Sequence, residues 1–349
     1  MRAIMKHRLF WPAAALVILI AINAIARPQF ILVTVRDGEL YGALIDILRN
    51  SAPLMLVALG MTIVIATRGI DLSVGAIMAV SGAVALTIID ASPDPGDLGT
   101  VLVALLVSLA VALVLGVWNG FLVAVVGIQP IIATLVLMLA GRGVALLITE
   151  GFITTVNSEP YEFIATGYLL ALPFAFLIWV AAVAVTGLME RRTALGVLTE
   201  AVGINPEASR LAGVRARGIV FGAYVVSGLL AGIAGVIYSS NIRAADANAA
   251  GLFIELYAIL AVVLGGTSLM GGKFTIAGTV IGVLTIQTLE ATILFLGVPS
   301  AQSPVFFAIV VVVVVLVQSP RLHRWARGAL RAARARNRSA ADDRTGVAS

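Results

Sequence analysis

The sequence contains no cysteine and only two histidines, which excludes several kinds of site. Without cysteine the chain can form no disulfide, no thiolate nucleophile and no cysteine metal site. His7 and His323 lie in basic segments near the two ends of the chain, where solvated interfacial side chains are expected. No metal site and no cofactor is therefore predicted. Charge is also scarce, because Asp, Glu, Lys and Arg together make up 12% of the residues.

Motifs for nucleotide binding and for hydrolysis are missing as well. The run Gly266–Phe274 resembles a phosphate loop, but its first glycine is misplaced and Phe274 replaces the Ser or Thr that binds magnesium. The chain has no Gly-x-Ser-x-Gly sequence and no pair of carboxylates at catalytic spacing on a predicted helix. It is therefore predicted not to be an enzyme, and any ATP that drives it must be bound by a partner.

Apolar residues dominate what is present. The chain of 349 residues is 60% hydrophobic with a mean hydropathy of +1.08, which places it among membrane proteins. A bilayer core about 30 Å thick takes roughly 20 apolar residues as helix. We predict an all-α, polytopic transmembrane helix bundle with ten membrane segments: Phe10–Ala26, Leu44–Thr67, Leu72–Ile89, Val101–Val126, Ile131–Thr149, Tyr168–Met189, Ile219–Ser240, Phe253–Met270, Thr275–Leu296 and Val305–Val317.

The distribution of basic residues predicts the orientation. An even number of segments places both termini on one side, and most of the 23 basic residues fall on that side. The opposite loops are acidic, with Asp90, Asp94 and Asp97 in one of them. The positive-inside rule therefore places both termini in the cytoplasm. The predicted domains are a transmembrane permease domain over residues 1–320 and a basic, disordered cytoplasmic tail over 321–349.

Each end of the chain has two interpretations. The first segment could be a cleaved signal peptide, but a chain with many later spans is more simply inserted by an uncleaved first helix. The basic tail could bind nucleic acid. Because it directly follows the last span, contact with anionic membrane lipid is the better interpretation, and no nucleic acid partner is predicted.

Ionisable residues inside the predicted segments are few: Asp46, Arg49, Arg142, Glu255 and Glu290. Most of them fall in the outward half under this topology, so the inner half is nearly uncharged. A proton relay across the whole membrane is poorly supported. The distribution fits an outer vestibule for a neutral polar solute, and equally fits residues that pair or snorkel for structural reasons.

Two stretches depart from simple spanning helices. Thr67–Gly75 combines glycines with a carboxylate, and Asp71 or Ser73 could cap the following helix. It is either a short cytoplasmic turn or a break between half-helices that meet inside the membrane, which would make two segments re-entrant.

The second stretch is the cytoplasmic loop 190–218. Asn205 before Pro206 predicts a capped helix over Pro206–Ala212 that ends at Gly213. Such a helix suits docking of a soluble partner, although it could also rest on lipid. Three pairs of glycines at four-residue spacing, Gly116 and Gly120, Gly228 and Gly232, and Gly278 and Gly282, predict close helix contacts within the chain.

Several motifs in order resemble one known family, the permease subunits of binding-protein-dependent ABC importers for ribose, xylose, galactose and related sugars. The resembling stretches are Gly60–Ala66, Gly69–Gly75, Trp118–Gly120, Gln129-Pro130, Ala133–Leu135, Gly141–Gly143 and Gly265–Gly272. Asp37–Leu40, Ile45–Leu48 and Ala245–Asn248 most resemble the permeases of galactofuranose importers. Arg68 departs from the family, since many relatives carry a small residue there.

The resemblance implies the function and the partners. It implies a permease in the inner (plasma) membrane that receives a sugar from a periplasmic sugar-binding protein, pairs with a second permease subunit, and docks cytoplasmic ABC ATPase subunits through a coupling helix over Glu200–Val214. The implied coupling residues are Glu200, Ala201, Gly203, Asn205, Ala208 and Gly213. The candidate substrate-path residues are Asp71, Ser73, Asn119, Arg142, Asn241, Asp246, Asn248 and Glu255. For Arg142, a role in packing is an equal alternative.

Two other functions remain as alternatives. An ion-coupled secondary carrier would share the fold class but should carry ligands for a coupling ion. A membrane enzyme acting on lipid-linked sugars would need catalytic residues clustered at one interface, whereas the acidic residues here are scattered through the outer loops.

Overall fold

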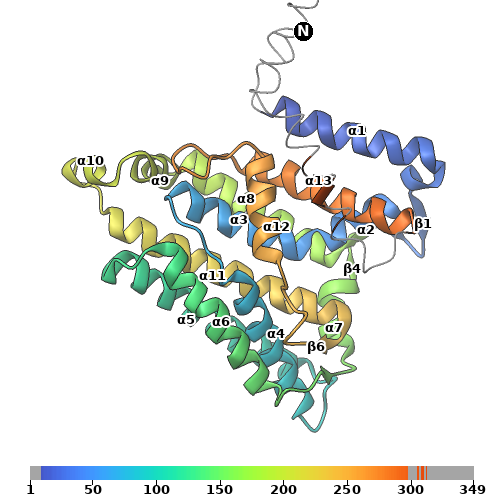
Figure 1. The fold of residues 1–349 in the computed structure, drawn as a ribbon. Coiled ribbons are helices and arrows are strands. Elements are labelled where there is room, and N and C mark those ends of the chain that lie inside the picture. The colour runs from blue at the N-terminus through green and yellow to red at the C-terminus, as the bar shows by residue number, and fades with distance from the viewer. Residues whose placement is uncertain (1–8, 298–304, 306–307, 310–311, 313–349) are drawn as a thin grey trace, which may run out of the picture. The chain divides into compact units, whose positions relative to one another are not determined.

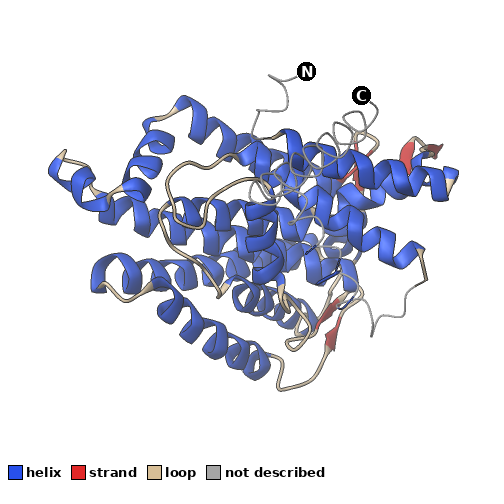
Figure 2. Cartoon of the chain, turned by 45° about the horizontal axis from the view of Figure 1, so that its top comes forward, coloured by secondary structure: helices blue, strands red, loops and turns tan. Residues whose placement is uncertain are grey.

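The computed structural model of the protein describes residues 9–297, 305, 308–309 and 312, and these are mostly helical (Figure 2). The chain forms two compact units, residues 1–291 and 292–349, and the description below concerns the first. His7, His323, the basic tail and the predicted domain boundary at residue 320 lie outside the described residues, as does most of the predicted segment Val305–Val317.

The helices of the first half follow the predicted apolar segments closely. They are α1 (Phe10–Ala26), η2 (Pro28–Ile31), α2 (Ala43–Asn50), α3 (Ala52–Ala66), α4 (Val74–Asp90), α5 (Leu98–Gly120), η3 (Phe121–Val126) and α6 (Pro130–Ile148). The second half contains α7 (Glu159–Thr166), α8 (Phe174–Arg192), α9 (Ala194–Ile204), α10 (Pro206–Leu211), α11 (Ala216–Ile242), α12 (Ile254–Leu264) and α13 (Ile276–Phe295).

The described residues are mostly helical, as predicted, and the loops add a few short strands. They form three antiparallel pairs: β1 (Thr34–Arg36) with β2 (Glu39–Tyr41), β3 (Thr154–Thr155) with β6 (Ala244–Ala245), and β4 (Tyr168–Leu169) with β5 (Leu172–Pro173). In the hairpin β4–β5 the two turn residues, Leu170 and Ala171, have positive φ angles, as a tight two-residue turn requires. The predicted segment Tyr168–Met189 therefore begins as a hairpin, and its helix starts at Phe174.

The core forms where α11 crosses three other helices. This helix of 27 residues packs along α3, α4 and α5 (Figure 1). Nearly every residue of α3 and α4 is buried, and an apolar helix without a polar face is one that is surrounded by other elements. The two helices therefore lie inside unit 1 rather than at its surface.

Small residues let these helices approach closely, as the glycine spacing predicted. A methyl group placed on Gly228 would lie 2.6 Å from Cα of Gly116, and one on Gly232 would lie 2.4 Å from Cβ of Ala112. The third glycine pair packs on α12, where Gly278 meets Gly265. All three predicted pairs are thus confirmed as contacts within the chain.

Fewer helices can span a membrane alone than the sequence predicted. Among the described residues, five are long and apolar enough: α5 continued by η3, α6, α8, α11 and α13. The bent pair of α2 and α3 would make a sixth. The predicted segment Phe253–Met270 contains only the 11 residues of α12, about 16 Å of helix at 1.5 Å per residue, because the chain turns at Gly265-Gly266 after Leu264.

A proline explains why the predicted segment Leu44–Thr67 is divided. The axes of α2 and α3 differ by 46° at Ser51, and Pro53 occupies the first turn of α3. Proline has no N–H and its ring crowds the carbonyl four residues earlier, so a helix bends or restarts there. At this junction the Ser51 hydroxyl donates a hydrogen bond to the Ile47 carbonyl at 2.6 Å.

The outer helices present apolar side chains on their exposed faces. Large exposed hydrophobic residues on α5, α6 and α8 include Leu106, Val114, Leu139, Leu147 and Leu188. A face of this size and character suits contact with lipid or with another membrane subunit. The chain is accordingly a multi-pass membrane protein.

We expect Gly228→Ala to destabilise the crossing of α5 and α11. The added methyl group would meet backbone atoms of Gly116 that cannot rotate away, and such overpacking costs about 1–3 kcal/mol. The measurement is thermal unfolding of the detergent-solubilised protein. Gly222→Ala on the same helix is the control, because nothing lies within 4 Å of a methyl group there. Equal melting temperatures for the two variants would contradict the described crossing.

Candidate functional site

The end of α3 has an unusual backbone. The Arg68 N–H donates to the Ile65 carbonyl at 2.9 Å, and the Gly69 N–H donates to the Val64 carbonyl at 3.0 Å. This is the Schellman pattern that closes many helices, with Arg68 at the left-handed position usually taken by glycine. Arg68 has a φ of 65°. The chain then runs without helix until Val74, where α4 begins.

A buried polar cluster occupies this break between α3 and α4. The Asp71 carboxyl group accepts hydrogen bonds from the N–H of Ser73 at 3.1 Å and from its hydroxyl at 2.6 Å. Its other oxygen accepts from the Ser227 hydroxyl at 2.8 Å. The Asn119 amide donates to the Ser73 hydroxyl at 2.7 Å. The cluster therefore connects the start of α4 with α5 and α11.

The sequence predicted three members of this cluster but not the fourth. Asp71, Ser73 and Asn119 come together, and all are buried, with 1%, 0% and 0% of their surface exposed. Ser227 belongs to no motif, and only the crossing of α11 places it there. Asp71 also does not cap α4 in the predicted way, since its carboxyl group bonds the N–H of Ser73, the residue before the helix.

Next to the cluster is a cavity of about 260 Å³. Thr67, Gly69, Val202, Pro206 and Tyr224 are among the residues that line it. The Tyr224 hydroxyl is buried without a hydrogen-bond partner, as is the amide oxygen of Asn119. Buried polar atoms normally find partners, and of these two residues only Tyr224 lines the cavity.

The remaining predicted path residues gather around the loop between α11 and α12. A guanidinium nitrogen of Arg142 donates to the carbonyls of Ala247 and Ala250 at 2.9 and 2.6 Å. The Asp246 carboxyl group accepts from the backbone N–H of Asn248 at 2.9 Å. Arg142 thus bonds this loop from α6, which fits the packing role and leaves its predicted place beside the substrate path open.

This loop reaches the start of α4. A methyl group placed on Gly75 would lie 2.4 Å from the Gly251 carbonyl oxygen and 2.7 Å from a carboxyl oxygen of Glu255. Glu255 is 6% exposed, whereas Asn241 and Asn248 are exposed. Polar groups therefore extend from the exposed loop, past Gly75, to the buried cluster at Ser73.

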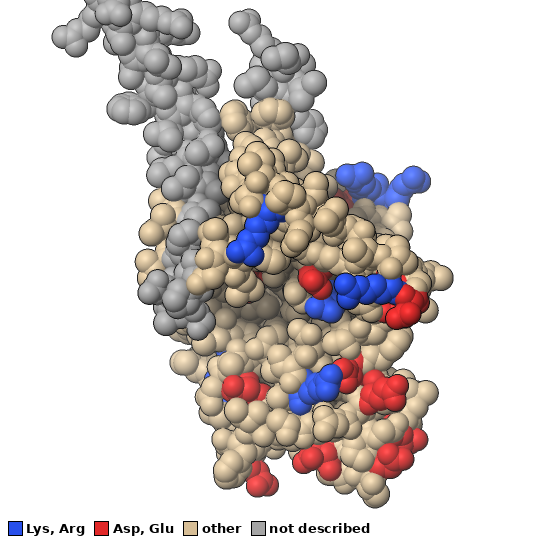
Figure 3. Space-filling view, turned by 90° about the vertical axis from the view of Figure 1, so that its right-hand side faces the viewer, with Lys and Arg blue, Asp and Glu red and all other residues tan. Residues whose placement is uncertain are grey.

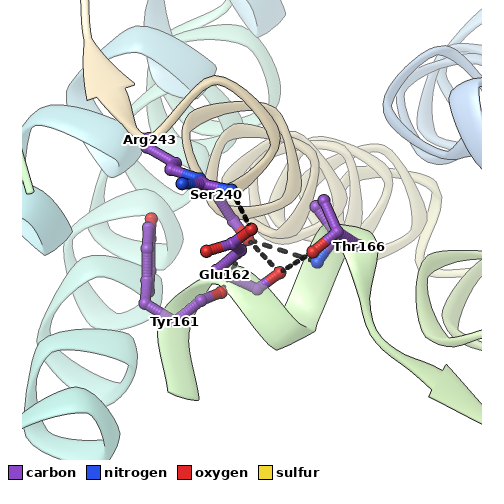
Figure 4. Close-up of polar contacts among 6 residues, drawn as sticks. Tyr161, Glu162, Thr166, Ser240 and Arg243 are labelled. Atoms are coloured by element: carbon purple, nitrogen blue, oxygen red, sulfur yellow. Dashed lines mark hydrogen bonds and ion pairs between the residues drawn. The ribbon is translucent and has the colours of Figure 1, made fainter. Parts of the chain in front are cut away.

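A second set of contacts fixes α7 on the end of α11 (Figure 4). The hydroxyls of Tyr161 and Ser239 lie 2.7 Å apart, the Ser240 hydroxyl donates to the Tyr161 carbonyl at 2.6 Å, and Arg243 pairs with Glu162. These bonds hold the base of the loop that contains Asp246.

Exposed carboxylates of neighbouring loops include Asp90, Asp94, Asp97, Glu150 and Glu159, and Figure 3 shows acidic side chains gathered in the lower part of one face.

The predicted capped helix is present in the loop 190–218. The Asn205 side chain accepts from the Ala208 N–H at 3.0 Å, and α10 covers Pro206–Leu211. It closes with a Schellman pattern at Gly213, whose φ is 86°. The hydrogen bond from Arg210 lowers the pKa of Glu207 below its ordinary value. The predicted boundary at Ala212 is right to within one residue.

The loop contains two helices rather than one over Glu200–Val214. Pro206 has no N–H to continue α9, and Asn205 takes an extended backbone instead. Glu200, Ala201 and Gly203 therefore belong to α9, Ala208 belongs to α10, and Gly213 follows α10. Asn205, Ala208 and Gly213 are exposed, whereas Gly203 is buried. A methyl group placed on Gly203 would lie 1.8 Å from the Ala66 carbonyl oxygen, so α9 packs against the end of α3.

The described helices form an apolar bundle that has a polar break between α3 and α4 and a capped helix at one end, an arrangement that suits a membrane transport component. The profile of the family described as branched-chain amino acid transport system, permease component, matches residues 43–315. The chain belongs to this family.

Individual relatives match along most of their length. The galactofuranose transporter permease YtfT of Escherichia coli is 48% identical over 90% of this chain and 92% of its own. The fructose import permease FruF of Bifidobacterium longum is 42% identical, over 92% and 90%. The ribose import permease RbsC of Escherichia coli is 37% identical, over 88% and 92%. No solved structure matches the chain significantly.

We expect Asp71→Ala to destabilise the break between α3 and α4. The change removes the acceptor of three hydrogen bonds and leaves the buried hydroxyls of Ser73 and Ser227 short of a partner, at about 1–3 kcal/mol for each such group. Thermal unfolding in detergent measures the loss. Asp90→Ala is the matched control, because Asp90 is exposed at the other end of α4. If the Asp71→Ala protein melts at the same temperature as this control, the cluster contributes nothing to stability.

Proposed function

We propose that the protein is the membrane-spanning permease subunit of an ATP-driven ABC importer that translocates a monosaccharide, with galactofuranose as the first candidate. Relatives that match most of the chain are named as permeases for galactofuranose, fructose and ribose. The 48% identity to the galactofuranose permease extends over 90% of this chain, together with the resembling stretches noted above. This favours galactofuranose over the other two sugars.

The substrate route is proposed to follow the series of polar groups. It would begin at Asn241, Asp246 and Asn248, pass Glu255 and Gly75, and continue to the cluster of Asp71, Ser73 and Asn119. The unpartnered oxygens of Asn119 and Tyr224 are hydrogen-bond acceptors and donors of the kind that sugar hydroxyls need. The cluster is closed in the present conformation, so passage requires the break to move.

One observation carries the proposal: α9, which is followed by the exposed helix α10, packs directly on the end of α3, next to this polar break. A soluble ATPase that grips α10 would act through α9 on the segment that holds Asp71. Glu200, Ala201, Gly203, Asn205, Ala208 and Gly213 are proposed as coupling residues on this basis. Of these, Asn205, Ala208 and Gly213 lie on the exposed surface.

The finer topology is also a proposal. All ten apolar segments would enter the inner membrane with both termini in the cytoplasm, and the short elements α4 and α12 would be broken or re-entrant. Asn119 lies about 10 Å before the end of η3 at 1.5 Å per residue, which is inside the bilayer if η3 ends at its surface. The permease domain would extend to residue 320, and the basic tail would follow it.

The proposed partners follow from the same scheme. They are cytoplasmic ABC ATPase subunits at α9–α10, a periplasmic sugar-binding protein at the outer loops, and a second permease subunit of the same or a related chain. The apolar faces of α5, α6 and α8 suit membrane lipid or that second subunit. The tail would contact anionic lipid.

Ala208→Arg tests the docking helix. The side chain of Ala208 is exposed, so we expect an arginine there to leave insertion intact, to block the ATPase sterically and to reduce sugar uptake at least tenfold. Uptake and ATPase co-purification are measured in cells with the matching ATPase and binding protein. Ala91→Arg, in an exposed outer loop, is the control. Gly203 is unsuitable, because any side chain there collides with α3.

The energy source is tested with an ATPase that binds but does not hydrolyse ATP. We expect uptake of labelled galactofuranose to fall to background, since the chain has no nucleotide motif of its own. Uptake that persists would favour an ion-coupled secondary carrier instead. Competition by unlabelled ribose or fructose tests the sugar: stronger competition by either than by galactofuranose would contradict the proposed substrate.

A further inference from the structure

The strongest unassigned feature is the side chain of Arg68, which bridges two cytoplasmic loops. Its Nε donates to the Met270 carbonyl at 3.2 Å, in the loop between α12 and α13. One of its terminal nitrogens donates to the Ile204 carbonyl at 2.5 Å, at the last residue of α9. A single guanidinium therefore connects the break after α3 with the coupling pair α9–α10 and with the loop after α12.

Backbone contacts bring the same three segments together. The Gly272 N–H donates to the Ala66 carbonyl at 2.9 Å. A methyl group placed on Gly203 would lie 2.5 Å from the Gly272 nitrogen, and one on Gly271 would lie 2.3 Å from Cγ of Arg68. Glycines at these positions thus make room for the arginine and for close approach of the chains.

The backbone of Arg68 indicates that the side chain is used. Its φ of 65° lies in the left-handed region, where glycine is favoured and a side chain is disfavoured. Non-glycine residues persist in such conformations where their surroundings hold them, and these places are often functional. Two hydrogen bonds from the guanidinium, a rigid donor group with a fixed fork, supply that restraint.

The position of Arg68 relates it to the polar break. It lies three residues before Asp71 on the same non-helical segment, and it bonds to the end of the helix that packs on α3. We propose that Arg68 is a positioning residue that transmits movement of α9–α10 to the Asp71 cluster, so that ATP hydrolysis and opening of the sugar path occur together. This rests on the proposed function, because it requires an ATPase at α10.

Arg68→Gly removes the guanidinium but keeps a residue that favours the left-handed backbone, so it tests the side chain alone. Glycine is favoured at this φ, so we expect the variant to insert, to bind the ATPase and to melt at or above the wild-type temperature. The measurement is sugar uptake and ATP hydrolysis by the full importer in the same proteoliposomes. We expect uptake per ATP hydrolysed to fall at least tenfold, while hydrolysis continues. Arg68→Lys keeps the charge but loses the forked guanidinium, and its uptake per ATP hydrolysed should fall nearly as far.

Lys273→Gly is the matched control, since it removes an exposed positive charge from the neighbouring loop. It should keep the wild-type ratio of uptake to hydrolysis.

Three results would overturn the proposal. A lower melting temperature with equal losses of uptake and hydrolysis would make Arg68 a structural residue only. Loss of ATPase binding would make it part of the docking surface. A wild-type ratio in Arg68→Lys would show that charge alone matters, as in contact with a lipid headgroup. Wild-type uptake that needs no ATP would instead contradict the proposed function itself.

Discussion

The surrounding structure depends on the buried carboxyl group of Asp71, which must be given hydrogen-bond donors. A carboxyl group enclosed in an apolar interior is costly unless it is hydrogen-bonded, and none of the three ion pairs in the described part of the chain involves Asp71. Hydroxyls of Ser73 and Ser227 supply the bonds instead. Because these donors come from α4 and α11, the crossing of those helices and the glycines that allow it are needed for the cluster to form.

Unwound backbone beside the cluster follows the same rule. In a bilayer every N–H and C=O group must find a partner within the protein, so non-helical chain is tolerated only where protein or a cavity surrounds it. The Schellman closure at Arg68, the bond from Gly272 to Ala66 and the contact of Thr134 with the Ile70 carbonyl at 3.3 Å supply such partners. These bonds stabilise the break in the arrangement described here.

The distribution of contacts relates coupling to the path. The loop between α11 and α12 is held by Arg142 and by the pair of Arg243 with Glu162, whereas Arg68 joins the end of α3 to the carbonyls of Met270 and Ile204. The exposed helix α10 packs on α9 and α11, and α9 packs on the end of α3. A movement of α10 would therefore reach the polar break through α9, as the proposed coupling requires.

The sequence by itself determined the membrane class, the family, the glycine contacts and the capped helix α10, because hydropathy, spacing and capping are local properties. It also indicated Asp71, Ser73 and Asn119 individually as candidate path residues. Only the tertiary structure decided that Ser227 completes their cluster, that α12 is too short to span alone, and that Arg68 bonds two distant loops. The bond from Ser227 to Asp71 and the bonds of Arg68 join residues more than a hundred positions apart, whose meeting no local pattern encodes, whereas α12 ends where the chain turns at Gly265-Gly266.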